Sequence, residues 1–202
     1  MEKYTTDTEI SKFEDIDLLK TYTFADYLKW PFDERVELIK GKIFPMSGPG
    51  TSHQRVSQRL SAKLYNFLEN KSCEVFTAPF DIRWPRRSKE DKEILTVLQP
   101  DICVICDPSK IDEWGCIGDP DIVVEILSPG NYQKELKNKY EVYEEAEVLE
   151  YWIIHPEDKT FMKYSLNVDG KFQLSHLLTL GDEITSPILP DFTLSLDEFF
   201  RD

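Results

Sequence analysis

Residues 121–127, DIVVEIL, place a glutamate inside a run of β-branched and aliphatic residues. Such a run is typical of a strand buried within a sheet. Side chains alternate along a strand, so Glu125 shares a face with Val123 and Leu127 and points away from Val124. Because an isolated buried carboxylate is strongly destabilising, the fold must bring an ammonium, a guanidinium or a metal ion to Glu125.

The spacing of apolar residues along the rest of the chain predicts the fold class. Helical spacing covers residues 21–30, 53–70 and 131–146, with Thr51 or Ser52 as the cap of the second helix. Strands are predicted at 36–46 (a hairpin with its turn at Lys40 and Gly41), 73–84, 96–106, 121–127 and 149–156, followed by a hairpin over 160–178 that turns at Asp169 and Gly170. Residues 189–200 predict a closing strand or loop that leads into a terminal helical turn.

This order predicts an α/β or α+β fold in which a mixed sheet is flanked by helices. The length of 202 residues favours one domain over residues 21–202, preceded by a flexible polar leader at 1–20. Fold class alone does not determine a function.

Charge and cysteine content limit the classes of function. With 38 acidic and 24 basic residues, the formal net charge is −14. This charge argues against a broad basic surface that would bind a polyanion. Basic residues cluster only locally, in RWPRRSK (83–89) and KELKNK (134–139). No stretch approaches the roughly 18 apolar residues of a membrane span. We expect reduced thiols at Cys73, Cys103, Cys106 and Cys116, no zinc site, and a cytoplasmic location.

Asp101 and Glu125 are candidates for a shared site. Asp101 follows Pro100 at the start of one apolar run, and Glu125 lies near the end of the next. If the two strands pair antiparallel, the carboxylates meet, and their repulsion favours a divalent ion between them, with Mg²⁺ or Mn²⁺ suited to oxygen ligands and water. The alternative is structural: Asp101 caps a turn, and Glu125 forms a buried pair with Lys139 or an arginine.

Three further polar residues admit two interpretations each. His53 precedes Val56 on the apolar stripe of its helix, so it is either a core histidine or a site residue. Glu37 alternates with apolar neighbours and is compatible with either a site or solvent. Glu135 and Lys139 are four residues apart on a helix, the spacing of a simple surface pair.

Several segments together resemble one family. The proline and aspartate at 100–101, followed by Glu125 in an apolar strand, are similar to the PD-(D/E)XK nuclease signature. More specifically, the chain resembles the Uma-two family of restriction endonucleases from about residue 22 to residue 200. The matching segments are VELIKGKIFPMS, SHQRVSQRL, LQPDICVI, PDIVVEILSPG, the helix with Glu135 and Lys139, EYWIIHP and LPDFTLSLDEFF.

The resemblance implies a restriction-endonuclease-like core and a metal-dependent endonuclease that hydrolyses phosphodiester bonds in DNA with Mg²⁺ or Mn²⁺. Asp101 and Glu125 would hold the metal, with Glu37 as a third acid. Lys139 would orient or deprotonate the attacking water and stabilise developing negative charge.

The resemblance also implies contacts around the site and shows one departure. His53 and Glu135 would contact the substrate or support the metal ligands. The lysine usual two residues after Glu125 is Leu127 here, and Lys139 on the following helix matches the position used in the family. The alternative is an inactive protein that keeps the nuclease fold as a binding or assembly module, and a homodimer is one arrangement that would add a second basic surface.

Overall fold

The computed structural model describes residues 10–86, 88–128 and 132–201, the last range without the side chains of 132–135. Contacts divide the chain into two compact units. The first unit comprises Met1–Ser47 and Pro85–Val97, and the second comprises Gly48–Trp84 and Leu98–Asp202. Within the described ranges, none of the helices has the length and apolar character needed to cross a membrane.

The first unit contains a hairpin and short helical turns. Its elements are η1 (Phe13–Asp15), α1 (Phe24–Tyr27), β1 (Val36–Ile39), β2 (Lys42–Pro45), η2 (Asp91–Glu93) and the first residue of β5 (Val97–Leu98). β1 and β2 pair antiparallel, and Lys40 and Gly41 in their turn both have positive φ, 50° and 78°. That conformation suits a two-residue hairpin turn, so the predicted hairpin is confirmed.

The second unit is built on a six-stranded sheet in the order β12-β11-β10-β9-β6-β3. Its strands are β3 (Glu74–Thr77), β6 (Ile102–Ile105), β9 (Ile122–Ile126), β10 (Glu150–His155), β11 (Thr160–Leu166) and β12 (Phe172–Leu174). β9 and β10 are parallel, joined by helix α3 (Tyr132–Glu145), and the other neighbours are antiparallel. The sheet is therefore mixed, as predicted.

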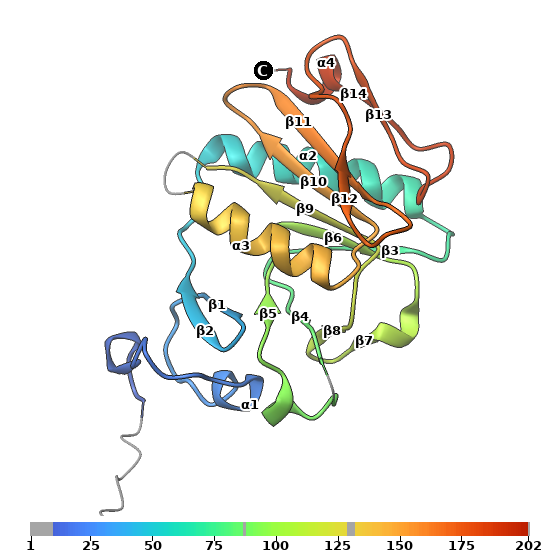
Figure 1. Ribbon diagram of the computed structural model, residues 1–202. Coiled ribbons are helices and arrows are strands. Elements are labelled where there is room, and N and C mark those ends of the chain that lie inside the picture. Colours follow the sequence, from blue (N-terminus) through green and yellow to red (C-terminus); the bar gives the residue numbers. More distant parts are fainter. Residues whose placement is uncertain (1–9, 87, 129–131, 202) are drawn as a thin grey trace, which may run out of the picture. The chain divides into compact units, whose positions relative to one another are not determined.

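Helices α2 (Thr51–Leu68) and α3 lie on opposite faces of this sheet (Figure 1). The main core lies between α2 and the sheet. Its members include Val56, Leu60, Leu64, Ile122, Val124, Ile126, Trp152, Ile154 and Phe161. Alternation along β9 sends Val123 and Glu125 to the other face, toward α3. The same alternation that makes β9 a good core strand therefore directs its one acid toward a helix.

Smaller elements complete the second unit. They are β4 (Ile82–Arg83), η3 (Pro108–Lys110), β7 (Ile111–Asp112), β8 (Gly115–Ile117), β13 (Glu183–Thr185), β14 (Thr193–Ser195) and α4 (Leu196–Phe199). β13 pairs with β14, and β8 pairs with β4 and β7. The closing strand and terminal helical turn predicted from the sequence are confirmed as β14 and α4.

Two predicted strands are each divided in the structure. Residues 73–84 form β3 and β4, with Pro79 between them, and residues 96–106 form β5 and β6, with Pro100 between them. Proline lacks the N–H that a sheet ladder requires, so neither strand continues through it. The predicted N-cap of α2, Thr51 or Ser52, is also wrong. The helix begins at Thr51, and Gly50 takes the cap position. The Ser52 hydroxyl donates to Glu157.

The prediction of reduced thiols is wrong for one pair of cysteines. Cys73 and Cys106 form a disulfide. They lie opposite each other one step beyond the pair Glu74 and Ile105 in the β3–β6 register, a proximity that the sequence spacing did not reveal. Cys103 and Cys116 are free and buried. Burial raises the pKa of Cys103 well above its usual value and that of Cys116 to about 12, so both stay protonated at neutral pH.

The packing of α2 can be tested with matched leucine variants. Leu64 is fully buried, whereas Leu177 is 55% exposed. We expect Leu64→Ala to lower the free energy of unfolding by about 2–5 kcal/mol, because it leaves a cavity between α2 and the sheet. Leu177→Ala should change it by less than about 0.5 kcal/mol. Urea titration measures both, and equal losses would contradict the described core.

Candidate active site

Asp101 and Glu125 come from neighbouring antiparallel strands. β6 and β9 pair with Ile102 opposite Val124, so the next step of the register places Asp101 opposite Glu125. The backbone N–H of Ile126 donates to Oδ2 of Asp101 over 2.7 Å. The predicted antiparallel pairing is confirmed, and it brings the two acids to the same end of β9.

Glu125 is buried, with 7% of its surface exposed, and α3 supplies its partners. The Lys139 ammonium lies 3.0 Å from Oε1 and 3.1 Å from Oε2, and the Tyr143 hydroxyl donates to Oε1 over 2.6 Å. Lys139 and Tyr143 are four residues apart and so share one face of the helix. The buried pair that the sequence left open as an alternative is thus present, and it explains how the strand tolerates a carboxylate.

Asp101 contacts helix α2 as well as β9. Its Oδ1 lies 3.1 Å from Nε2 of His53, which belongs to the first turn of α2. The carboxylate therefore joins the start of a helix to the end of a strand, and it does not cap the turn after Pro100. Nδ1 of His53 is buried and has no hydrogen-bond partner among the described residues. His53 is on the buried stripe, as predicted.

Three other predicted positions have separate outcomes. Glu37 is buried in β1 of the first unit, not exposed to solvent, and its role as a third metal ligand stays a prediction. The side chain of Glu135 lies outside the described residues, so its role also stays a prediction. Leu127 is buried directly after β9 and supplies no charge, which leaves Lys139 as the ammonium beside Glu125.

Tyr143 is a further site residue, which the sequence pattern did not single out. It is indeed fully buried, with its ring centroid 5.7 Å from that of Trp84 and 4.9 Å from that of Tyr151. Its hydroxyl nevertheless bonds Glu125. The available signal was its position one helical turn beyond Lys139.

The oxygen atoms at this site are of the type that binds divalent ions. Asp101 and Glu125 offer carboxylate oxygens, and Mg²⁺ is commonly held by one or two carboxylates with water in its other positions. In the described part of the chain, no group of three or more His, Cys, Asp and Glu side chains is arranged to hold a metal. An ion bound by these two carboxylates would fill its other positions with water or with a further acid, and it would compete with the donors that now contact them.

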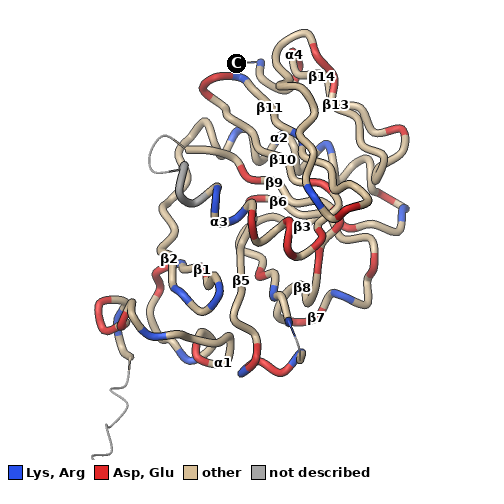
Figure 2. The backbone as a smooth tube through the Cα atoms, viewed as in Figure 1, with Lys and Arg blue, Asp and Glu red and all other residues tan. Residues whose placement is uncertain are grey.

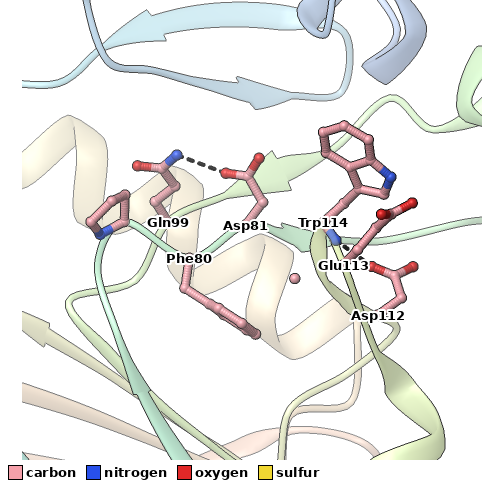
Figure 3. Close-up of a pocket in the computed structure, with 8 residues that line it drawn as sticks. Phe80, Asp81, Gln99, Asp112, Glu113 and Trp114 are labelled. Atoms are coloured by element: carbon pink, nitrogen blue, oxygen red, sulfur yellow. Dashed lines mark hydrogen bonds between the residues drawn. The ribbon is translucent and has the colours of Figure 1, made fainter.

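A separate hollow of about 300 Å³ lies in the second unit (Figure 3). It is lined by Pro79, Phe80, Asp81, Gln99, Asp112, Glu113, Trp114 and Gly115. Gln99 donates to Asp81 over 2.7 Å, and Arg83 donates to Asp112. Burial opposes ionisation of Asp112, but the hydrogen bonds from Arg83 and the backbone of Trp114 outweigh it and lower its pKa. Three acids make this hollow unsuited to a phosphate backbone.

The sheet with α2 and α3 on its two faces is a nuclease-like fold. The crystal structure of a protein titled "putative nuclease belonging to DUF820", from Anabaena variabilis, matches with a TM-score of 0.69 and 21% identity over 89% of this chain and 97% of that one. The chain belongs to the Uma2 family, described as "Putative restriction endonuclease", whose model matches residues 24–197. The predicted fold class and the resemblance are thereby confirmed.

Two curated relatives come from Synechocystis sp. (strain ATCC 27184 / PCC 6803 / Kazusa). The uncharacterized protein slr1290 is 28% identical over 72% of this chain and 74% of its own length. The uncharacterized protein sll1609 is 24% identical over 67% of this chain and 75% of its own length. Neither relative carries a described activity in its name, so the chemistry has to be argued from the site.

The buried pair can be tested by removing its ammonium. We expect Lys139→Met to lower the free energy of unfolding by about 3–5 kcal/mol, because Glu125 is left as a buried charge. The double variant Glu125→Gln with Lys139→Met should recover most of the loss. Lys63→Met, which breaks a more exposed pair with Glu198, should cost at most about 1 kcal/mol. Equal losses for the two lysines in urea titrations would contradict the described pairing.

The hydroxyl of Tyr143 can be removed without changing the ring. We expect Tyr143→Phe to lower the free energy of unfolding by about 1.5–3 kcal/mol, because a buried carboxylate loses a hydrogen bond. The control is Tyr65→Phe on the exposed side of α2, for which a change within about 0.5 kcal/mol is expected. If thermal or urea unfolding shows no difference between the two variants, the hydroxyl does not support Glu125.

Proposed function

We propose that this protein is a divalent-metal-dependent endonuclease that hydrolyses phosphodiester bonds in DNA. The observation that carries the proposal is the approach of Asp101 to β9, in which the Ile126 N–H holds one carboxylate oxygen over 2.7 Å beside Glu125. Membership of the Uma2 family and the nuclease-like fold support the reaction class. The fold by itself would not select a reaction.

In this proposal Asp101 and Glu125 hold Mg²⁺ or Mn²⁺, and Glu37 is the proposed third acid. When bound, the ion would act as a Lewis acid on the phosphate and make a water molecule easier to deprotonate. His53, 3.1 Å from Oδ1 of Asp101, holds that carboxylate in its orientation. Glu135 is proposed to support the site from the first half of α3.

Lys139 has two roles in the proposed chemistry. Its ammonium lies within 3.1 Å of both oxygens of Glu125, so it compensates the carboxylate in a buried place. The same positive charge, close to the ligand oxygens, can orient the attacking water and stabilise the negative charge that grows on the phosphate. Tyr143 donates to the same carboxylate and keeps Glu125 oriented.

The second candidate function is a nucleic-acid-binding or assembly module without catalysis. One observation favours it: Glu125 is already paired with Lys139 and Tyr143. Homodimerisation also remains a proposal, and sedimentation of the purified chain tests it. The two functions differ in a single outcome, which is metal-dependent cleavage.

The test is cleavage of a supercoiled plasmid with Mg²⁺, Mn²⁺ or a chelator. Wild type should nick or linearise the DNA only with metal, whereas Asp101→Asn and Glu125→Gln should fall to background. His53→Ala should lose activity about 10–100-fold, as expected when a residue that supports a metal ligand is removed. Asp169→Asn, in the exposed turn between β11 and β12, is the matched control and should cleave as wild type does.

Calorimetric titration with Mn²⁺ separates binding of the metal from chemistry. Wild type and Asp169→Asn should bind the ion, and Asp101→Asn should bind it at least about tenfold more weakly. A parallel assay with RNA of the same sequence tests the choice of DNA. Nucleic-acid binding without any metal-dependent cleavage would overturn the enzyme and leave the binding module.

A further inference from the structure

Helix α2 differs from the rest of the chain in its charge. The chain contains 38 acidic residues among 202, yet no Asp or Glu occurs between Glu37 and Glu69. The charged side chains of α2 are therefore Arg55, Arg59 and Lys63 alone. Figure 2 shows the tube of α2 in blue and tan without red. In a protein with a net charge of −14, an acid-free helix of 18 residues is a local surface that a polyanion could approach.

The outward side of α2 consists mainly of hydrogen-bond donors. The residues turned away from the core, which we call the α2 outer surface, are Thr51, Gln54, Arg55, Gln58, Ala62, Tyr65 and Asn66. Apart from Ala62, each has a side chain that can donate to a phosphate oxygen. Side chains of these types supply most protein contacts to phosphate and sugar. Tyr65 is 67% exposed, which adds an accessible ring next to the donors.

The three cations of α2 have different partners. The Arg59 guanidinium donates to backbone carbonyls of the C-terminal segment, including that of Phe199 over 3.0 Å, and Lys63 lies 3.3 Å from Glu198. Arg55 is exposed and makes no side-chain hydrogen bond or ion pair with the described residues. Arg59 and Lys63 thus fasten the C-terminal segment, and Arg55 is the cation available to a ligand.

The outer surface begins beside the candidate active site. His53 contacts Asp101 over 3.1 Å from the buried side of the first turn, and Gln54 and Arg55 are the next two residues, on the exposed side of the helix. A nucleic-acid strand bound to this surface would therefore lie across the first turn of α2, whose buried side holds Asp101 through His53. Glu157, which accepts from the Ser52 hydroxyl over 2.8 Å, places an acid beside the helix start and limits the surface on that side.

We propose that the α2 outer surface binds the phosphate backbone of the DNA substrate, with Arg55 as its charged contact and Gln54, Gln58 and Tyr65 as neutral contacts. This inference rests on the proposed nuclease function and adds the place where substrate binds. Contacts of this kind position a duplex without reading its bases. The surface should therefore contribute affinity that depends on salt and does not depend on base sequence.

The experiment is fluorescence anisotropy with a labelled DNA duplex in chelator, where metal-dependent cleavage cannot occur. Arg55→Glu should weaken binding about tenfold at roughly 0.1 M salt and reduce the slope of log K against log salt by about 1, the effect of losing one phosphate contact. Arg55→Lys should retain the wild-type slope. The matched control is Lys29→Glu, an exposed lysine of the first unit, which changes net charge equally and should leave the slope unchanged.

The outcomes separate the two proposals. If wild type binds and cleaves DNA but Arg55→Glu and Lys29→Glu have the same affinity and slope, the α2 outer surface is not the binding surface and the nuclease stands. If wild type neither binds nor cleaves nucleic acid, both proposals are overturned. Because Arg55 is exposed, its variants should unfold at the same urea concentration as wild type, which confirms that a loss of binding is local.

Discussion

The structure of the second unit depends on one buried electrostatic contact, between Glu125 in β9 and the ammonium of Lys139 in α3. The apolar residues of β9 pack well against the helices on both faces of the sheet. The strand can carry a buried carboxylate only if the helix over that face, α3, brings a positive charge to it. Tyr143 adds a neutral donor from the next turn of the helix. The position of α3 on the sheet and the burial of the carboxylate are thus consequences of the same contacts.

This arrangement explains why the structural and catalytic interpretations of Glu125 are compatible. A carboxylate that is compensated by a lysine stays ionised in a buried place, and an ionised carboxylate is what a divalent ion requires. Asp101 is held differently, by a backbone N–H and by His53, and is more exposed at 19% of its side chain. One carboxylate is therefore fixed in the core, and the other is more accessible to solvent.

Much of the fold could be predicted because local patterns decide it. The alternation in β9, the turn at Lys40 and Gly41 and the apolar stripe of α2 each require only neighbouring residues, and the structure has all three. The position of Asp101 opposite Glu125 followed from one assumption about strand direction. What could not be predicted depends on contacts between distant segments. The disulfide of Cys73 with Cys106 needs the register of two strands, and the bond from Tyr143 needs the rotation of α3 about its axis.

The bond from Ile126 to Asp101 has a consequence for how this site can diverge among relatives. Its donor is a main-chain amide, so the identity of the side chain at that position does not enter the contact. Any aliphatic side chain that fits the core can replace Ile126 without losing this hydrogen bond. Only proline would remove the backbone N–H that donates it. The aspartate is thereby anchored to a feature of the polypeptide that nearly every substitution preserves.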